Sequence, residues 1–451
     1  MESPLIEEVL NTATKIAEAA EVFELSTQET PVNFEANILK QLQNKESYSL
    51  ALRIFKAGRI GFALTNGMSS LSSSQEKSKE LIQTLLNMAL ETSQFGFPYN
   101  FNFSPQSNYP RVNIFDSQVE KVTVEEMLGL GNKLITKVKN YAPDILCDVE
   151  VDKGTKSIHI INSQGGDVSY HKSFFGIGIE GILTQGTDML FVGDSEGSCQ
   201  ASNEMSGVAD RVVTQLEMAK RQASVSTKSL PVILTPRGVA SAFFSPIALA
   251  FNGKTVLEGA SPLEGKLEER VFNNKLSLWD DPTIDYCLGS SPCDDEGVPS
   301  QRTILINEGI ATNFIYDLQT AALAKTKSTG NGKRSGAGTP KPGMNFLVIK
   351  EGTTSFNDMV ANIKEGLIVE QLMGAEQGNV LGGDFGGNVL LGYKVENGEI
   401  IGRVKDTMIS GNIYEVLKQP IELGCAAREV DGIMKTPHLY CPYLAVSTGG
   451  R

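Results

Sequence analysis

Histidine is the residue type that most limits the chemistry open to this chain, because the sequence contains only three: His159, His171 and His438. A zinc site of the H-E-x-x-H kind needs two imidazoles one helical turn apart, and these histidines do not have that spacing. A Ser-His-Asp or Cys-His arrangement stays open, since such partners need not be neighbours in sequence. We expect no nucleophile elbow, no catalytic residue, no metal ligand and a structural role for each histidine.

The six cysteines lack the C-x-x-C spacing of zinc knuckles and redox sites. In a large chain of this kind we expect reduced and mostly buried thiols. Cys425 and Cys441 lie in a Gly- and Pro-containing C-terminal stretch where nothing nearby in sequence clearly lowers a thiol pKa. Lys435 and His438 would do so only if the fold brings them close, so the role of both thiols stays open.

Glycine-rich and acidic segments could bind phosphate or a hard cation, but their patterns favour turns. The segments 328–332 and 382–387 match neither the P-loop nor a dinucleotide fingerprint between a strand and a helix. We interpret them as sites of positive φ or close backbone approach. The acids at 280–281 and 294–296 fit no EF-hand loop, and Asp-Asp-Pro and Asp-Glu-Gly are typical turn sequences.

Charge and hydropathy exclude two classes of partner. The formal net charge is -13, so phosphate backbones repel the chain and we expect no nucleic-acid partner. The most basic stretch, Lys325–Lys341, is rich in glycine and is predicted to be a solvated loop. The longest apolar run, Val239–Phe251, is interrupted and shorter than the roughly 20 residues of a membrane span. The N-terminal sequence lacks a basic n-region, so we expect a cytoplasmic location and no membrane partner.

The elements that must position these residues are easiest to recognise in the first half of the chain. Apolar periodicity and a Thr123–Glu126 capping box predict helices, and short turns between alternating segments predict hairpins. The predicted helices are 4–20, 75–93, the one after Thr123, and 206–221; the predicted hairpins are 53–64 and 157–171, and a strand is predicted at 21–25.

The second half has more glycine clusters and fewer helical patterns. We predict one helix near 315–324 and another at 356–364, with Ser355 as N-cap and Gly366 as its C-terminal stop. The remainder is predicted to be short strands and turns. The fold class is therefore α+β, with N-terminal helices packed on a mainly antiparallel sheet and an irregular β-rich C-terminal domain. We place the domains at 1–224 and 225–451.

The C-terminal pattern resembles the TldD/PmbA family, also called the modulator of DNA gyrase family. The resemblance covers nearly the whole chain, is looser in the first half, and is specific as a set of motifs. They are Leu257–Leu267, Asp280-Asp281-Pro282, Asp294–Pro299, Ile306–Gly309, Ser328–Asn331 with Arg334, Gly383-Asp384-Phe385, Gly392–Ile400 and Gly411-Asn412.

One departure from the family pattern indicates the PmbA (TldE) branch. The catalytic TldD branch carries H-E-x-x-x-H shortly before the stretch equivalent to Leu257–Leu267. Here the corresponding region, Phe243–Leu249, has no His, Glu or Cys, so it offers no side chain that binds zinc. Cys425 resembles a C-terminal cysteine ligand of the TldD branch, but one thiol is not a site. We expect no cofactor in this chain, zinc only in a TldD-type partner, and no activity of the chain alone.

The resemblance implies a noncatalytic subunit of a metallopeptidase complex that acts on small or unfolded peptides. Its partner would be a TldD-like subunit or a second copy of itself in a dimer. A self-sufficient hydrolase with a thiol or an unrecognised metal site, and a homodimeric peptide-binding protein, are the alternatives. We predict that Gly382, Gly383, Asp384, Gly386 and Gly387 let a peptide approach the backbone and add as a strand. A tight-turn scaffold would explain the same glycines.

Overall fold

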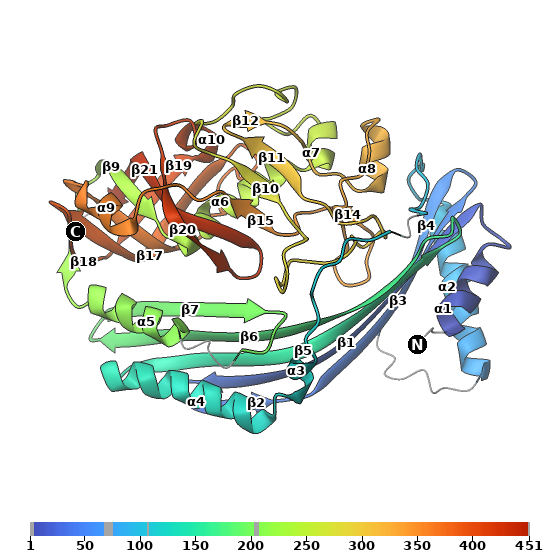
Figure 1. Cartoon of the computed structure of the whole chain (residues 1–451), viewed down its shortest axis with the longest axis horizontal. Helices are drawn as coiled ribbons and strands as arrows, with labels where there is room; N and C mark the ends of the chain where they lie inside the picture. Colours follow the sequence, from blue (N-terminus) through green and yellow to red (C-terminus); the bar gives the residue numbers. More distant parts are fainter. Residues whose placement is uncertain (1–3, 67–74, 106–107, 203–206, 450–451) are drawn as a thin grey trace.

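The N-terminal half is a long, curved antiparallel sheet (Figure 1). The computed structural model describes residues 4–66, 75–105, 108–202 and 207–449. Within this part of the chain the strand order is β4-β3-β1-β5-β6-β7, and β2 pairs with β1. The strands are β1 Ala19–Glu35, β2 Ile38–Leu42, β3 Lys45–Lys56, β4 Arg59–Asn66, β5 Leu146–Asn162, β6 Asp167–Gln185 and β7 Asp188–Ser198.

Helices cover one face of this sheet at both of its ends. At one end α1 and α2 pack against β1, β3 and β4, and at the other end α4 and α5 pack against β5, β6 and β7. Thr123 and Glu126 form the predicted capping box at the start of α4. The helices are α1 Pro4–Ala13, α2 Gln75–Ser93, α3 Ser117–Lys121, α4 Val124–Tyr141 and α5 Gly207–Met218.

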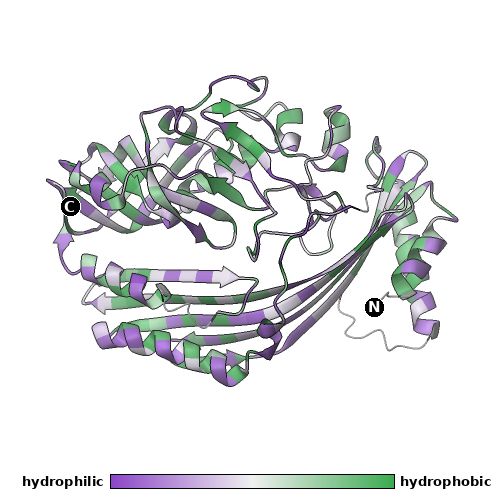
Figure 2. Cartoon of the chain, viewed as in Figure 1, coloured by the Kyte–Doolittle hydropathy of each residue, from purple (hydrophilic) through white to green (hydrophobic). Residues whose placement is uncertain are grey.

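Side-chain alternation along the strands separates the two faces of the sheet. In β5, Cys147, Val149 and Val151 are buried on the helix side. The residues between them are polar and point to the opposite face, as the two-residue period of a strand requires. Figure 2 shows this alternation of hydrophobic and hydrophilic residues along the long strands. The C-terminal half covers the face that carries these polar residues. Further along β5 this face carries Ile158 and Ile160, which pack against Cys293 and Ala337.

The C-terminal half is built on a twelve-stranded mixed sheet, in the order β12-β11-β10-β15-β21-β9-β16-β17-β18-β8, with β19 and β20 beside it. A separate two-stranded ribbon is formed by β13 Gly332–Lys333 and β14 Lys341–Pro342. The other strands are β8 Gln222–Ala223, β9 Lys228–Leu234, β10 Leu278–Asp280, β11 Thr303–Asn307, β12 Ile310–Ala311, β15 Leu347–Ile349, β16 Glu365–Met373, β17 Asp384–Glu396, β18 Glu399–Val404, β19 Thr407–Asn412, β20 Glu422–Val430 and β21 Met434–Thr448.

The longest helix of this half, α6, was not predicted from the sequence. Thr235 is its N-cap, and Val239, Phe243 and Ile247 bury one face in the main core. Pro246 within the helix obscured the signal, but burial of the apolar face outweighs its low helix propensity. The helices of this half are α6 Pro236–Ala250, α7 Gly253–Leu257, α8 Leu318–Leu323, α9 Phe356–Ala361 and α10 Ile413–Val416.

The predicted fold class, α+β with mainly antiparallel pairing, is confirmed. Both predicted hairpins and the helix 75–93 are present. Several boundaries were wrong. Helix α5 ends at Met218 instead of 221, and α9 ends at Ala361 instead of 364. Helix α1 ends at Ala13, the strand predicted at 21–25 belongs to the longer β1, and Gly366 lies in β16 instead of ending a helix. No helix of the described residues is long and apolar enough to cross a bilayer.

The two halves share part of their hydrophobic core. One cluster joins Val138 and Val149 of the N-terminal half to Ile368 and Tyr393 of the C-terminal half. This shared core fixes the C-terminal half over the sheet, and the division at residues 224 and 225 stays a prediction.

Candidate functional site: a groove between the two halves

A buried ionic network joins the two halves near α1 and α2. Arg53 of β3 donates to Glu21 of β1 at 3.0 Å and to Glu296 of the C-terminal half at 2.8 Å. Arg334 donates to the second oxygen of Glu21. All four side chains are at least 96% buried and alternate in charge, so each carboxylate has a cationic partner.

The protein environment compensates only part of the desolvation of these acids. Burial raises the pKa of Glu296 to about 7, although the Arg53 charge acts to lower it. Burial also raises the pKa of Asp294 well above its usual value, and the charge of Glu296 adds to this effect. The Asp294 carboxylate accepts hydrogen bonds from the backbone N–H groups of Glu296, Val298 and Gly332. The network is therefore tightly packed and structural in character.

A second ionic contact joins the halves at the opposite end, near α5. Arg428 of β20 donates through both terminal nitrogens to the carboxylate of Asp194 in β7, at 2.7 Å each. Arg211 of α5 contacts the same carboxylate. Burial acts to raise the pKa of Asp194, but these two arginines hold it below its usual value. This carboxylate thus stays ionised and ties β7 to β20.

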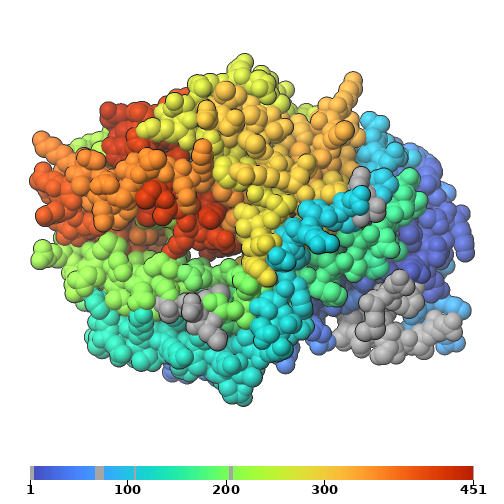
Figure 3. Space-filling model, in the orientation of Figure 1, coloured from blue at the N-terminus to red at the C-terminus, as the bar shows by residue number. Residues whose placement is uncertain are grey.

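A groove lies between these two contacts and consists of three connected cavities. Their volumes are about 750, 540 and 480 Å³. Asp152, Phe174 and Leu288 line both the first and the second cavity, and Glu150 and Ser195 line both the first and the third. We call this space the central groove. Figure 3 shows a recess between the light-green and red segments on the face turned to the viewer.

The floor of the central groove is the polar face of β5 and β6. Register pairs Asp148 with Glu180, Glu150 with Gly178, Asp152 with Gly176, Gly154 with Phe174, and Lys156 with Lys172. From the C-terminal half, the groove is lined by Leu288, by Arg428 and Glu429 at the end of β20, and by Asp431 and Gly432 in the turn before β21. Acidic residues therefore occupy the floor near α5, and lysines occupy the floor toward the buried network.

Two glycine motifs lie in this floor, and our expectation about one of them was wrong. Residues 193–197 read G-D-S-E-G, which has the G-x-S-x-G form of a nucleophile elbow. The structure places them inside β7, not at a strand-to-helix turn, and Ser195 donates to Asp431 at 3.0 Å. Residues 176–181 read G-x-G-x-x-G but lie wholly within β6. Neither context fits the chemistry of its motif.

These glycines instead make room in the groove. A Cβ at Gly176 would lie 2.4 Å from an Asp152 carboxylate oxygen, and one at Gly197 would lie 2.6 Å from a Leu288 methyl group. Because these glycines have no side chain, Asp152 and Leu288 can line the groove. Apart from the spacing of these glycines, no local sequence pattern predicts the strand pairing that forms this part of the groove.

The segment Phe243–Leu249 forms the second half of α6. Phe243 is fully buried and packs edge-on against Phe385, with ring centroids 5.5 Å apart. Ser245 donates a hydrogen bond to Glu376. Among the described residues, no three His, Cys, Asp or Glu side chains are grouped so that they could hold a metal ion. The residues at this position of α6 do not fit zinc.

The predicted peptide-binding glycines lie beside α6, outside the residues that line the central groove. Gly383 has a φ of +86°, and a Cβ there would lie 2.2 Å from the Tyr414 ring. Asn412 donates to the Gly382 carbonyl at 2.7 Å and to the Asp384 carboxylate at 2.9 Å. This part is a tight-turn scaffold.

The neighbouring Gly386 and Gly387 lie in β17, where they pair with Ser410 and Ile409 of β19. The connection 374–383 runs near the opposite edge, since a Cβ at Gly387 would lie 3.0 Å from the Met373 carbonyl oxygen. Other segments of this chain therefore lie beside both edges of β17 at these glycines. Peptide binding at these glycines stays a prediction.

Two of the three histidines are diagonal neighbours on the β5–β6 hairpin, and the third lies in β21. His159 bonds to Asp167 at 2.9 Å, and His171 bonds to Ser157 at 2.8 Å, both on the β5–β6 hairpin. His438 of β21 stacks near Phe356. Burial, assisted by the Arg428 charge, lowers the pKa of His438 to about 4. The imidazole is therefore neutral at physiological pH.

The cysteines are free thiols, and five of the six are buried. Burial raises the pKa of Cys147 to about 11 and that of Cys287 to about 12. Burial also raises the pKa of Cys441. Cys425 in β20 is exposed, and its backbone N–H donates to the Thr354 carbonyl. The expectation of mostly buried thiols is correct.

The basic stretch Lys325–Lys341 was predicted to be solvated, and for Arg334 this was wrong. Its guanidinium is buried, pairs with Glu21 and lies 4.7 Å from the centroid of the Phe23 ring. A lone sequence segment cannot reveal a partner 313 residues away. At the predicted acidic turns, the Asp281 carboxylate accepts from the backbone and side chain of Thr283. Asp280, by contrast, is fully buried and accepts from Asn331 and Asn345.

Sequence and structure comparisons agree on one family. Residues 227–448 match the PmbA/TldA metallopeptidase C-terminal domain, and residues 20–89 match the PmbA/TldA metallopeptidase domain 1. An uncharacterised protein of Methanocaldococcus jannaschii is 26% identical over 93% of this chain and 94% of its own length. A metalloprotease TldD homologue of Haemophilus influenzae is 31% identical over 49% of this chain and 47% of its own length.

The fold gives the same answer. The crystal structure of TldE from Thermococcus kodakarensis covers 98% of this chain and all of that chain, with a TM-score of 0.86 and 23% identity. This likeness of fold extends over both halves of the chain. Together with the matched sequence domains and the motifs near α6, it shows that the chain belongs to the TldD/PmbA metallopeptidase family.

Proposed function

We propose that this chain is a noncatalytic, PmbA/TldE-type subunit of a metallopeptidase complex that acts on small or unfolded peptides. The composition of α6 carries this proposal. At the place where the catalytic branch of the family has H-E-x-x-x-H, this helix presents Phe243, Pro246 and Ile247 to the core. An aromatic ring and aliphatic side chains supply neither a zinc ligand nor a carboxylate that activates water.

The central groove gives the subunit a role in holding substrate. It is concave and lies between two rigidly joined halves, and its lining combines polar and aromatic groups. Such clefts are the usual places where ligands are held and oriented. A TldD-like partner would supply the zinc and the reaction centre. This chain would contribute part of the chamber that retains the peptide.

A thiol hydrolase is the first competing function. The five buried cysteines cannot reach a substrate without local opening. Cys425 is accessible, but the histidine across the β20–β21 pairing, His438, has a pKa lowered to about 4 by burial. An imidazole of such low basicity is a poor base for a thiol at neutral pH. The homodimeric peptide-binding protein is the second alternative and differs from our proposal only in its partner.

Three measurements on the purified chain test the proposal. We expect less than stoichiometric zinc by elemental analysis and no peptide hydrolysis by the chain alone. Hydrolysis should appear when a TldD-type subunit is added, and a chelator should abolish it. Chelator-sensitive hydrolysis by the isolated chain would contradict the proposal. If a TldD-type subunit cleaves peptides equally well without this chain, the proposal is contradicted too. If this chain forms a stable homodimer and does not bind a TldD-type subunit, the homodimeric alternative is favoured.

A further inference from the structure

Three lysines line the 540 Å³ cavity of the central groove. Lys156 and Lys172 stand directly opposite each other on β5 and β6, and Lys333 of β13 lines the same cavity. Within the described part of the chain, none of these three ammonium groups forms an ion pair with a carboxylate. Like charges directly opposite each other in an antiparallel pair are destabilising, so this arrangement needs a reason other than stability.

Three carboxylates also line this cavity, but none of them pairs with a lysine of the cavity. Glu29 forms an ion pair with Lys45 at 3.4 Å. Asp295 accepts a hydrogen bond at 2.7 Å from a backbone N–H of the β13–β14 ribbon. Asp152 lies further along β5, where burial and the charges of Glu150 and Glu29 raise its pKa to about 6. A carboxyl with a cation beside it would have a lowered pKa, so these acids leave the lysines unneutralised.

The surroundings of Lys172 suit an uncharged amine. Its nitrogen donates to the backbone carbonyls of Leu288 and Ser290. An ammonium has three N–H donors, whereas a neutral amine has two and a lone pair, so these two carbonyls satisfy the neutral form completely and leave its lone pair free. The nearby thiols of Cys199 and Cys287 are neutral, because burial raises the pKa of both.

The protonation of Lys172 agrees with these surroundings. Burial lowers its pKa from 10.5 to about 8, and the charges of Lys333 and Lys156 act in the same direction. At pH 7 roughly a tenth of this amine is unprotonated, against about one part in three thousand for a lysine of ordinary pKa. A lysine that is desolvated and lies beside other cations is the kind that attacks carbonyl carbon.

The cavity has room and side chains for a small molecule that carries an anionic group. Its volume of about 540 Å³ is within the range of small-molecule sites. Tyr170 and Phe174 contribute aromatic walls, and the Lys156 nitrogen lies 5.6 Å from the centroid of the Phe174 ring. Lys156 and Lys333 offer charged donors to a carboxylate or phosphate at the same wall as Lys172.

We propose that Lys172 binds small carbonyl compounds that carry a carboxylate or phosphate, and that it does so by forming an imine with them. The amine nitrogen attacks the carbonyl carbon, a C=N bond replaces the C=O bond, and the oxygen leaves as water with the two protons of the amine. No oxidant or reductant takes part. Lys156 and Lys333 hold the anionic group. This activity goes beyond the proposed subunit role and needs no partner chain.

Reductive trapping tests the site without any variant. The probe is pyridoxal 5′-phosphate, an aromatic aldehyde with a phosphate group, added to the full chain at neutral pH and reduced with borohydride to convert the imine into a stable secondary amine. Peptide mapping by mass spectrometry should find Lys172 modified roughly tenfold faster, or more, than the exposed lysines. If Lys172 is modified no faster than the exposed lysines, the proposal is wrong.

A charge-preserving variant assigns the trapped imine. Lys172→Arg keeps the positive charge and removes the nucleophile, so trapping should fall to the level of the exposed lysines. The matched control is Lys133→Arg, at an exposed position on α4, which should trap as much probe as wild type. Wild-type trapping in Lys172→Arg would place the imine on another residue and refute the proposal.

Pyridoxal without the phosphate tests the requirement for an anion. Wild type should bind pyridoxal 5′-phosphate roughly tenfold more tightly than pyridoxal, as expected for two solvent-accessible ion pairs. Lys156→Gln/Lys333→Gln should bring the two affinities close together while Lys172 is still the residue modified. Equal affinities in wild type, or an unchanged preference in the double variant, would contradict the proposed ligand class.

Discussion

Arg53 of β3 and Glu296 of the C-terminal half form an ion pair of 2.8 Å in which both side chains are almost completely buried. Arg53 also pairs with Glu21, and its guanidinium lies 5.0 Å from the centroid of the Phe103 ring. These contacts connect strands from the first sixty residues to a loop near residue 300. The network therefore holds one end of the central groove, and its integrity determines how the two halves sit.

Replacing this arginine should destabilise the protein strongly. Arg53→Met leaves Glu21 and Glu296 without their shared cation in a buried site, and loss of one partner of a buried pair typically costs about 3–5 kcal/mol. Urea denaturation should report this loss. Arg111→Met, at an exposed position, should stay within about 0.5 kcal/mol of wild type.

A compensating variant makes this test more specific. Arg53→Met leaves Glu296 without a cationic partner, whereas Glu21 keeps Arg334. Adding Glu296→Gln removes the unpaired carboxylate, so the double variant should recover part of the lost stability. If Arg53→Met is as stable as wild type, or if the second change deepens the loss, the buried network does not hold the halves together.

His438 should give the protein a pH-dependent stability. Burial and the Arg428 charge lower its pKa to about 4, against about 6.5 in an unfolded chain. Between these values the unfolded chain binds more protons, so the free energy of unfolding falls as pH is lowered from 6.5 to 4. This one group should contribute up to about 3 kcal/mol of that decrease.

The pH effect is measured by urea denaturation at several pH values in wild type and His438→Gln. The difference between the two stability curves should be flat above pH 6.5 and should change steadily below it. His171→Gln is the control, because this histidine is exposed and bonds to Ser157. An identical slope in wild type and His438→Gln would show that the buried imidazole does not titrate as described.

Local patterns were enough to predict much of the fold. The Lys56–Arg59 turn, the Thr123–Glu126 capping box and the Ser355 N-cap are each specified by a few neighbouring residues, and the structure has all three. Helix α6 was missed because Pro246 interrupts its helical signal, although Thr235 and Pro236 mark its start, and burial of its apolar face in the core stabilises it.

The candidate site was largely outside the reach of the sequence. Glu21 and Arg334 lie 313 residues apart, and Ser195 and Asp431 lie 236 apart. No local sequence pattern predicts such contacts, because strand register and sheet packing bring these residues together. The absence of zinc ligands in Phe243–Leu249, by contrast, is a property of residue types and could be read directly. Of the glycine segment at 382–387, Gly382 and Gly383 lie in a turn, whereas Asp384, Gly386 and Gly387 belong to β17. The sequence did not show that this segment lies outside the lining of the central groove.

Thiol reactivity should distinguish Cys425 from the other five cysteines. Cys425 is exposed, and the others are buried. A thiol-labelling reagent should therefore modify one cysteine per chain in the folded state and all six after unfolding. Cys425→Ser should abolish the fast phase without affecting peptide cleavage by the complex with a TldD-type subunit. If Cys425→Ser abolishes cleavage, the alternative function of a thiol hydrolase is supported.

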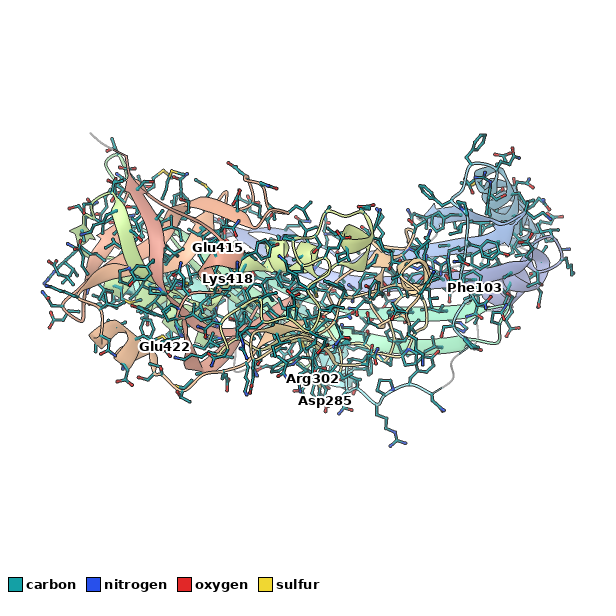
Figure 4. All side chains as sticks on the ribbon, turned by 90° about the horizontal axis from the view of Figure 1, so that it is seen from above. Phe103, Asp285, Arg302, Glu415, Lys418 and Glu422 are labelled. Atoms are coloured by element: carbon teal, nitrogen blue, oxygen red, sulfur yellow. The ribbon has the colours of Figure 1, made fainter. Side chains whose placement is uncertain are left out.

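An exposed ion pair in the C-terminal half serves as a control for loss of surface charge. Figure 4 shows Lys418, Glu415 and Glu422 on the C-terminal half. Lys418 and Glu415 form an exposed pair at 2.8 Å. Such pairs contribute about 0–1 kcal/mol, so Lys418→Gln should leave both stability and peptide binding nearly unchanged. A large loss of either would mean that this face takes part in assembly.

The two glycines before and within β17 separate a role in peptide binding from a role in folding. A Cβ at Gly386 would lie 3.4 Å from the Ser410 Cβ, an ordinary contact, so Gly386→Val should fold. Gly383→Val would place a Cβ 2.2 Å from the Tyr414 ring at a φ of +86°, so it should cost several kcal/mol and lower the urea midpoint. If β17 accepts a peptide strand near Gly386, Gly386→Val should reduce cleavage by the complex while the urea midpoint stays near that of wild type. Unchanged cleavage would leave Gly382–Gly387 as a turn scaffold and the central groove as the place where peptides are held.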